Sequence, residues 1–339
     1  MRKVTIIDTT MRDGSHAIAH TYTPEKVAAI TRGLVKAGCR KIEIGHGDGL
    51  LGSSIQYGFS SYDETELVKA AVENRGDATI GVLLIPGIGT IEDLDRMYEL
   101  GVRSVRVATH VTEADTGAEH IRHAKKIGME AVGFLMMSHM READKIVEQA
   151  KLFESYGADI VYMADSAGAM IPSMVTDRVK ALKENVRIPV GFHAHNNLSL
   201  AIGNSLAAIE AGCDYIDATL AGLGAGAGNA PHEVLQAVLE KAGYESGEKL
   251  YPLMDVADEE VRSMGVRMEV DKYALTIGYA GVYSSFFLHA KRAADRYGLD
   301  ARDILAELGR MKTVGGQEDM ILDVAYRMAK QKEEEDAKR

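Results

Sequence analysis

Two histidines separated by one residue, His193 and His195, stand in the segment Pro189-Val-Gly-Phe-His-Ala-His-Asn-Asn197. Side chains alternate between the two faces of a β-strand, so residues i and i+2 point the same way. If this segment is a strand, both imidazoles project from one face and can hold a single metal ion. The alternative is a pair of polar side chains that bond only to solvent or backbone. The pair by itself does not decide between these two interpretations.

The elements that would position this pair follow a repeating pattern. A short apolar run rich in β-forming residues precedes a longer amphipathic segment, and the unit recurs along most of the chain. The predicted strands are Thr5–Thr10, Lys41–His46, Thr79–Ile85, Ser104–Ala108, Ala131–Met136, Asp159–Ala164, Pro189–His195 and Tyr215–Leu220. Strands that alternate with helices predict a parallel sheet with right-handed crossovers.

Eight such units predict an α/β protein with a closed TIM (β/α)₈ barrel, whose usual size is about 250 residues. A doubly wound open sheet is the alternative, but eight even repeats suit closure better. We expect the barrel to occupy residues 1–266. Beyond it, Pro252–Met264 reads as a further helix, and residues 267–339 predict a small helical C-terminal domain without strands. The charged segment Lys330–Arg339 is expected to be a frayed, solvated end.

Composition excludes several classes of function. The net charge of −11 argues against non-specific binding to nucleic acid, whose phosphates need a basic surface. There is no secretory signal and no run of eighteen apolar residues, so no membrane span is expected. The two cysteines, Cys39 and Cys213, are predicted to be buried free thiols. These features together predict a cytoplasmic protein.

Polar residues gather where the predicted strands end, which is the face that carries the chemistry in barrel enzymes. Six of the eleven histidines lie within a few residues of such an end: His16, His46, His110, His139, His193 and His195. Random placement would spread them over the helices and over both ends of the barrel. This clustering favours the metal interpretation of the pair on the seventh strand.

Two histidines and one carboxylate make a facial metal site with open positions. Spacing leaves four carboxylates as candidates for the third ligand: Asp8, Asp13, Glu43 and Asp165. Such a donor set suits Mn²⁺, Fe²⁺, Co²⁺ or Zn²⁺.

Other polar and glycine residues are interpreted more plainly. His20 is expected to be a partly exposed loop or helix residue rather than a ligand, and no role is assigned to His232 or to two further helical histidines, His120 and His123. The run Gly222–Gly228 follows the last strand rather than opening a first βαβ unit, so it is not expected to bind a dinucleotide. It predicts a tight loop whose backbone closely approaches the substrate or a neighbouring loop.

Several motifs, taken in order, resemble a known family. Asp8-Thr-Thr-Met-Arg-Asp-Gly14, His193-Ala-His-Asn-Asn197 and Gly222-Leu-Gly-Ala-Gly-Ala-Gly-Asn229 are similar to the metal-dependent lyases and synthases related to hydroxymethylglutaryl-CoA lyase. Gly45-His-Gly-Asp-Gly49, Asp165-Ser-Ala-Gly-Ala169 and Ala280-Gly-Val-Tyr-Ser-Ser285 narrow the resemblance to the 4-hydroxy-2-oxovalerate aldolases. The similarity runs from the first strand to about residue 330.

The resemblance implies a class II retro-aldol reaction that splits 4-hydroxy-2-oxopentanoate, or a homologue, into pyruvate and a short aldehyde such as acetaldehyde. Family members act in the meta-cleavage catabolism of aromatic compounds or steroids, typically with Mn²⁺ and in some cases with another metal such as Co²⁺. By position, the expected roles fall on these residues: Asp13, His193 and His195 as metal ligands, Arg12 at the developing enolate oxygen, His16 as the base for the C4 hydroxyl proton, Tyr283 orienting the substrate, and His193 and Ser166 as further substrate contacts.

The resemblance also implies a partner. The C-terminal helices would form a communication domain that docks an acylating acetaldehyde dehydrogenase, in a hetero-oligomer expected to be a heterotetramer. The aldehyde would then pass between the two enzymes through an internal tunnel. The chain departs from the family pattern at Met11 and Ser15, and Ser15 is expected to alter the hydrogen bonding of the adjacent His16 ring.

Other functions stay open at this stage. An acyl-CoA-dependent Claisen-type synthase or lyase of the same superfamily would use the same motifs. A non-haem iron oxygenase would use the same two-histidine, one-carboxylate set. A role mainly as a subunit of a larger assembly is compatible with the aldolase.

Overall fold

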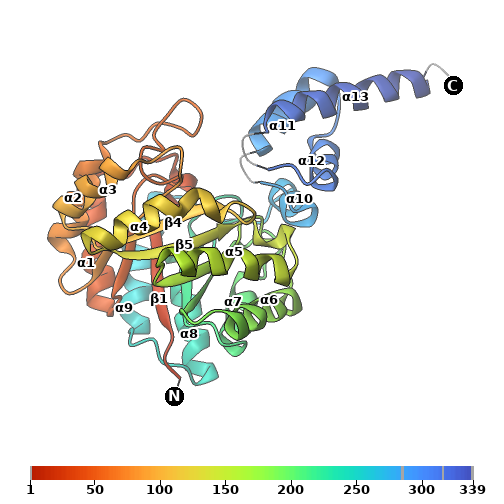
Figure 1. Cartoon of the computed structure of the whole chain (residues 1–339). Coiled ribbons are helices and arrows are strands. Elements are labelled where there is room, and N and C mark those ends of the chain that lie inside the picture. The colour runs from red at the N-terminus through yellow and green to blue at the C-terminus, as the bar shows by residue number, and fades with distance from the viewer. Residues whose placement is uncertain (1, 284–285, 315–316, 337–339) are drawn as a thin grey trace.

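The sheet closes on itself. The computed structural model describes residues 2–283, 286–314 and 317–336, and its strands form a closed parallel barrel in chain order (Figure 1). They are β1 (Thr5–Met11), β2 (Lys41–Ile44), β3 (Thr79–Leu84), β4 (Ser104–His110), β5 (Glu130–Met136), β6 (Ile160–Asp165), β7 (Val190–Ala194) and β8 (Tyr215–Ala218). Strand β1 pairs with both β2 and β8, which closes the ring. The predicted TIM barrel is confirmed, and the open sheet is wrong.

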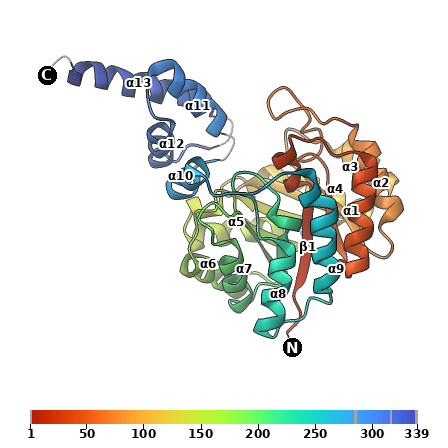
Figure 2. The same ribbon diagram turned by 180° about the vertical axis from the view of Figure 1, so that it is seen from behind.

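The crossover helices cover the outside of the barrel (Figures 1 and 2). They are α1 (Pro24–Ala37), α2 (Glu64–Asn74), α3 (Ile91–Leu100), α4 (Ala118–Ile127), α5 (Ala143–Tyr156), α6 (Pro172–Asn185), α7 (Ala201–Glu210) and α8 (His232–Ala242). Helix α1 illustrates why they begin and end where they do. The Thr23 side chain accepts a hydrogen bond from the Lys26 amide, Pro24 takes the first helical position, and Gly38 ends the helix with φ +98°.

Short 3₁₀ turns follow four of the strands and build part of the barrel mouth: η1 (Asp13–Ile18), η2 (Ala114–Gly117), η3 (Ser138–Met140) and η4 (Leu220–Gly222). Strand β2 is shorter than predicted, because Gly45 takes φ +140° and turns the chain before His46. Strand β7 ends at Ala194, so His195 lies just past its end.

The C-terminal region has its own apolar core. Its helices are α10 (Lys272–Ala280), α11 (Phe286–Tyr297), α12 (Ala301–Arg310) and α13 (Asp319–Asp336). A separate cluster of buried side chains holds them together, including Val282, Phe286, Ile304, Leu308 and Ile321. Figures 1 and 2 show these helices beside the end of the barrel that lies opposite the N-terminus. They therefore stand near the carboxyl ends of the strands.

The predicted helix Pro252–Met264 is confirmed as part of a continuous helical run, which passes from α9 (Leu250–Val256) through a π turn over Ala257–Val261 to a 3₁₀ turn over Arg262–Met264. One expectation about the C-terminal third needs correction. The charged end is not frayed as far as the structure describes it, because α13 continues to Asp336. Its high charge is accommodated on an exposed helix surface. No described helix is long and apolar enough to cross a membrane, and Cys39 and Cys213 are free and buried, as predicted.

Alternating charges cross the interior of the barrel. Arg106 on β4 donates from Nη2 to Asp217 Oδ1 at 2.7 Å, and its Nε lies 2.9 Å from Glu43 Oε2. Glu43 in turn lies 2.5 Å from the Nε of Arg12, and Asp217 lies 2.8 Å from the Nδ1 of His193. All of these side chains are at most 5% exposed. A chain of opposite charges therefore connects four strands to the predicted metal ligands.

A second buried charge cluster lies where α8 begins. His232 is fully buried, with Nδ1 2.8 Å from Asp8 Oδ2 and Nε2 2.6 Å from Glu248 Oε2. Burial lowers the pKa of His232, but the two carboxylates outweigh it and raise the pKa to about 10. The helical histidine to which the sequence assigned no role is thus a buried cation between two anions.

The contribution of His232 to the stability of the fold should depend on pH. Because the pKa of His232 is raised from about 6.5 when unfolded to about 10 when folded, its stabilisation is complete below pH 6.5 and is lost as the pH rises through 10. We expect His232→Gln to lower the free energy of unfolding by about 1.5–3 kcal/mol at pH 6, and by less at pH 10. Urea unfolding of both proteins at the two pH values measures this. A difference that does not change with pH would contradict the doubly paired imidazolium.

Candidate metal centre and active site

The two histidines of the seventh strand face each other. Their Nε2 atoms are 3.2 Å apart, and the side chains are 2% and 7% exposed for His193 and His195. The Nδ1 of His193 is hydrogen-bonded to the Oδ2 of Asp217 at 2.8 Å. A carboxylate on the far nitrogen fixes the orientation of a metal-binding imidazole. The predicted shared face of the two rings is confirmed, and both Nε2 atoms are directed at one point.

The carboxylate of Asp13 lies beside the imidazoles of His193 and His195. The three side chains form a buried group whose ligand atoms are all within 4.8 Å of one another. Asp13 stands directly after β1, at the start of η1, so the mouth of the barrel brings together residues that are far apart in sequence. The donor set of two nitrogens and one oxygen is the one expected for a divalent metal ion with open positions.

The other candidate carboxylates have different partners. Glu43 is bound by Arg12 and Arg106, and Asp8 by His232. Asp165 accepts two backbone amides, from Ala169 and Met170, each at 2.9 Å. Of the four carboxylates that the sequence left open, Asp13 is the one that the described residues group with both imidazoles, so it is the candidate third ligand.

Asn229 also belongs to this site, although the sequence reasoning did not select it. Its Nδ2 donates to Asp13 Oδ2, and its backbone bridges to His195. Its Oδ1 is buried and has no hydrogen-bond partner among the described residues. A buried acceptor without a partner is costly, so this oxygen is a candidate for a fourth ligand or for a bound water. The position of Asn229 at the end of the glycine run was the available signal.

The glycine run closes tightly over the site. A Cβ on Gly224 would lie 2.2 Å from Asn229 Nδ2 and 2.7 Å from Asp13 Oδ2, and Gly226 takes φ +61° against Asn197. The predicted close approach to a neighbouring loop is confirmed. Any side chain at residue 224 would displace the acid that faces the two histidines.

Electrostatics keep two of the candidate ligands, Asp13 and His195, in their binding forms. Burial alone raises the pKa of Asp13, but His195, Arg12 and His193 outweigh it and hold the pKa far below its usual range. Burial lowers the pKa of His195 to about 4. At neutral pH the acid is therefore an anion and this imidazole is neutral with a free lone pair, which is what metal binding requires.

Arg12 has one free donor group. Its Nε lies 2.5 Å from Glu43 and its Nη1 donates to Asp13 at 2.9 Å, while Nη2 is buried without a partner among the described residues. The Arg12 Nη1 also reaches the carbonyl of Gly47 at 3.4 Å. On the other side of Gly47 lies the His16 ring, because a Cβ on Gly47 would be 2.3 Å from His16 Nε2. Arg12 and His16 thus flank one glycine at the mouth of the barrel.

Tyr283 comes from the C-terminal region. Its hydroxyl lies 3.4 Å from the Met136 sulfur, and burial, followed by the negative charge of Asp48, raises its pKa well above the usual value. The preceding turn is tied to the barrel because Nε2 of His139 lies 3.0 Å from the carbonyl oxygen of Gly281. Ser284 and Ser285, which complete the motif quoted above, lie outside the described residues.

Ser166 lies on the loop after β6, and its hydroxyl accepts a hydrogen bond from the Met137 amide at 2.9 Å. Met137 has φ +57°, so this bond supports a strained turn between β5 and η3. The structure thus gives Ser166 a contact with the backbone, and any contact with substrate would be an additional one.

His20 lies in a turn, as predicted, but the partial exposure predicted for it is wrong. The ring is only 6% exposed and stacks on His46 with 3.7 Å between the ring centroids. The hydroxyl of Ser15 lies 2.8 Å from His20 Nδ1, so Ser15 contacts His20 and not the adjacent His16 as expected. The cause is the turn at the end of η1, where Ala19 and His20 both take positive φ and the chain folds back.

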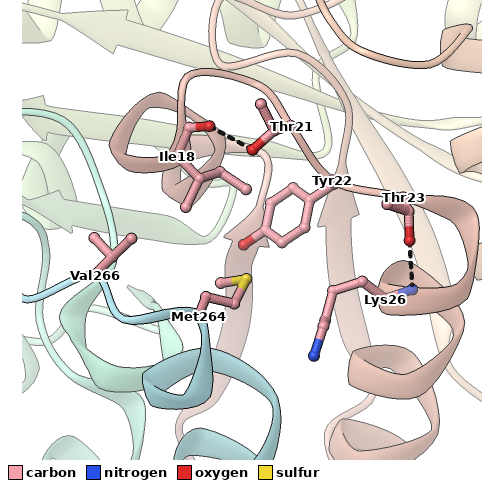
Figure 3. Close-up of a pocket in the computed structure, with 7 residues that line it drawn as sticks. All are labelled: Ile18, Thr21, Tyr22, Thr23, Lys26, Met264 and Val266. Atoms are coloured by element: carbon pink, nitrogen blue, oxygen red, sulfur yellow. Dashed lines mark hydrogen bonds between the residues drawn. The ribbon is translucent and has the colours of Figure 1, made fainter.

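A separate pocket of about 350 Å³ lies between the start of α1 and the segment after α9, and Figure 3 shows Tyr22 pointing toward Met264 across it. The Tyr22 hydroxyl donates to the Thr10 carbonyl at 3.0 Å. None of the candidate metal ligands lines this pocket. The pocket therefore belongs to the wall of the barrel and is separate from the candidate metal centre.

Asp217 is expected to control metal affinity without touching the metal. Asp217→Asn would remove the anion that orients His193, and loss of such a partner costs about 10–100-fold in metal affinity. Titration of the metal-free variant with Mn²⁺ measures this, and Asp214→Asn, at a partly exposed position on the same segment, is the control. Equal affinity in the Asp217 variant and the wild type would show that the carboxylate does not position His193.

Two family models match successive parts of this chain. Residues 3–259 match the family model described as HMGL-like, and residues 268–330 match the DmpG-like communication domain. The chain is 60% identical over 330 residues to the 4-hydroxy-2-oxovalerate aldolase of Carboxydothermus hydrogenoformans, covering 97% of this chain and 98% of that protein. It is 57% identical to the protein of the same name from Geobacillus thermodenitrificans, covering 98% and 97%.

A solved structure shows the same fold at lower identity. The carboxyl transferase domain of Rhizobium etli pyruvate carboxylase with pyruvate has a TM-score of 0.81 at 20% identity, covering 98% of this chain and 62% of that one.

The barrel and its matches define a carbon–carbon lyase of the HMGL-like class. Within that class, the chain belongs to the family of 4-hydroxy-2-oxovalerate aldolases.

Proposed function

We propose that this enzyme is a class II, metal-dependent pyruvate aldolase that cleaves 4-hydroxy-2-oxopentanoate, or a homologue, to pyruvate and a short aldehyde such as acetaldehyde. The substrate follows from the names of its relatives. The observation that carries the proposal is the buried group of Asp13, His193 and His195 beside the unpartnered Nη2 of Arg12. This places a candidate metal site next to a fixed cation, which suits a reaction that develops negative charge on an oxygen.

The fit of a metal to these residues can be judged from the donors. Two facing Nε2 atoms, an ionised carboxylate and a buried amide oxygen without a partner form a nitrogen and oxygen set that suits Mn²⁺, with Co²⁺ as a further option. When bound, the ion would supply Lewis acidity to a reaction that develops negative charge on a substrate oxygen. Asp13, His193 and His195 would hold it.

The chain's own residues account for the proton and charge movements. His16 takes the proton of the C4 hydroxyl, and the electrons of that O–H bond form the aldehyde carbonyl while the C3–C4 bond breaks. The electrons of the broken bond pass into the pyruvate enolate, whose oxygen faces the free Nη2 of Arg12. A permanent guanidinium stabilises that oxygen more strongly in a buried site than in water. Protonation at C3 then releases pyruvate.

Tyr283 and Ser166 would orient the substrate. The hydroxyl of Tyr283 is brought to the site from the C-terminal region and keeps its proton, because its pKa is raised by burial and by Asp48. It can therefore donate a hydrogen bond to the C4 oxygen. Ser166 would contact the carboxylate or the keto group, and His193 would contact substrate from the side of the metal.

Removal of the metal tests the proposal. We expect protein stripped with a chelator to release no pyruvate from 4-hydroxy-2-oxopentanoate, and Mn²⁺ to restore the activity. Coupling to lactate dehydrogenase measures pyruvate, and a panel of metals and longer 4-hydroxy-2-oxo acids defines the preferences. Full activity after exhaustive chelation would contradict a metal-dependent reaction. Release of free thiol from acetyl-CoA and a 2-oxo acid would instead identify a Claisen-type enzyme.

We also infer a partner, an acylating acetaldehyde dehydrogenase, with which the chain would form a heterotetramer and pass on the aldehyde. The match of residues 268–330 to a communication domain supports this inference. Large apolar side chains that are exposed on the helices of this domain also support it: Leu275, Tyr279, Leu288, Leu322 and Tyr326.

We place the domain boundary between residues 266 and 267. We propose that the enzyme acts in the catabolism of aromatic compounds or steroids. We also propose that it acts in the cytoplasm, where thiols such as Cys39 and Cys213 stay reduced.

A further inference from the structure

Beside the first metal group lies a second cluster with the same kinds of donor. The ligand atoms of His16, His20 and Asp48 lie within 4.8 Å of one another. The two groups are neighbours, because Arg12 contacts both Asp13 and the carbonyl of Gly47, and the His16 ring packs against Gly47. Like the first group, this one offers two imidazoles and a carboxylate.

The rings of this cluster are held in place by their surroundings. The centroids of His16 and His20 are 5.2 Å apart, and His20 stacks on His46. The hydroxyl of Ser15 is fixed 2.8 Å from His20 Nδ1. His46 is already satisfied, since its Nδ1 accepts from the Asp48 amide and its Nε2 lies 3.1 Å from the Gly58 carbonyl oxygen. His46 therefore supports His20 and Asp48, in the way that outer residues support metal ligands.

Charge favours a cation here. The carboxylate of Asp48 offers a cation one negative charge, and the imidazoles of His16 and His20 beside it offer two nitrogen donors. The Asp48 side chain is 23% exposed, so the cluster is open to solvent on that side.

We propose that His16, His20 and Asp48 form a second divalent-cation site, with a preference for Zn²⁺ and Co²⁺. Two nitrogens and one oxygen suit these ions, and affinity for such donors rises along the first-row series toward them and away from Mn²⁺. A cation in this site takes up the lone pair of His16. Excess Zn²⁺ then inhibits the Mn²⁺-loaded enzyme, a consequence that rests on the proposed function, whereas the binding itself does not.

Metal stoichiometry tests the site directly. Chelator-stripped full-length protein is titrated with Zn²⁺ by calorimetry and with Co²⁺ by its visible absorption, as wild type, Asp13→Asn, Asp48→Asn and the double variant. We expect the wild type to bind two equivalents, each single variant one, and the double variant none. Asp77→Asn, at a side chain that is 93% exposed, is the matched control and should bind two. Circular dichroism confirms that each variant is folded.

A second set of measurements separates this proposal from the aldolase assignment. His20→Gln should also bind one equivalent, and Zn²⁺ should inhibit pyruvate release by the Mn²⁺-loaded wild type at lower concentrations than it inhibits Asp48→Asn, in which only the first site can take up Zn²⁺. One equivalent in an active wild-type enzyme, or two in Asp48→Asn, would overturn the second site and leave the aldolase intact. Absence of pyruvate release with every metal would overturn the aldolase, while two equivalents that depend on Asp48 would still support the second site.

Discussion

His16→Ala is expected to lower turnover by about 10²–10⁴-fold, the usual effect of losing a general base. His16 packs against Gly47, whose carbonyl oxygen the Arg12 guanidinium contacts. In the proposed reaction, loss of this imidazole removes the group that takes the hydroxyl proton as the carbon–carbon bond breaks. Steady-state pyruvate release with saturating Mn²⁺ measures the effect, and KM should change much less than kcat.

Two controls make this result specific. Mn²⁺ affinity of the variant should equal that of the wild type, because His16 is not among the ligands of the first site. His120→Ala removes a histidine from the outer helix α4 and should leave kcat near the wild-type value. Turnover of His16→Ala within a factor of a few of the wild type would refute its role as the base.

Arg106→Met is expected to lower the free energy of unfolding by about 3–5 kcal/mol, because it removes the buried cation that Asp217 and Glu43 share. Arg106 is 2% exposed and binds both Asp217 and Glu43. These anions raise its pKa despite its burial, so the charge persists at any working pH. Urea denaturation with the linear extrapolation measures the change.

The matched comparison is Arg40→Met. Arg40 is 62% exposed on its side chain and lies 3.7 Å from an exposed Asp77, an arrangement that contributes about 0–1 kcal/mol. A loss in Arg106→Met no larger than in Arg40→Met would show that the charge chain inside the barrel does not stabilise the fold.

Periodicity alone predicted the positions of all eight strands, with ends displaced by a few residues. It also placed His193 and His195 on one face, because that depends only on the alternation of a strand. Periodicity cannot predict which residues far apart in the sequence will contact each other. Asp8 meets His232 at a separation of 224 residues, and Glu43 meets Arg106 across the barrel. The choice of Asp13 as the candidate third ligand rests on such a contact between distant residues, its grouping with His193 and His195.

The errors around histidines have one cause. A histidine on a helix or a loop carries no local sign of what covers it, so His20 and His232 were both expected to be unremarkable. Folding buries each of them, His20 against His46 and His232 between Asp8 and Glu248. Asn229 was passed over for the same reason, since its contact with Asp13 spans 216 residues.

The central claim is that Asp13, His193 and His195 hold a divalent ion at the mouth of the barrel. Anomalous diffraction from crystals grown with Mn²⁺, recorded on both sides of the manganese edge, tests it most directly. One strong anomalous peak is expected in contact with both Nε2 atoms and the Asp13 carboxylate, and it should be lost in Asp13→Asn. Well-ordered crystals of active enzyme with no peak beside these three side chains would contradict it.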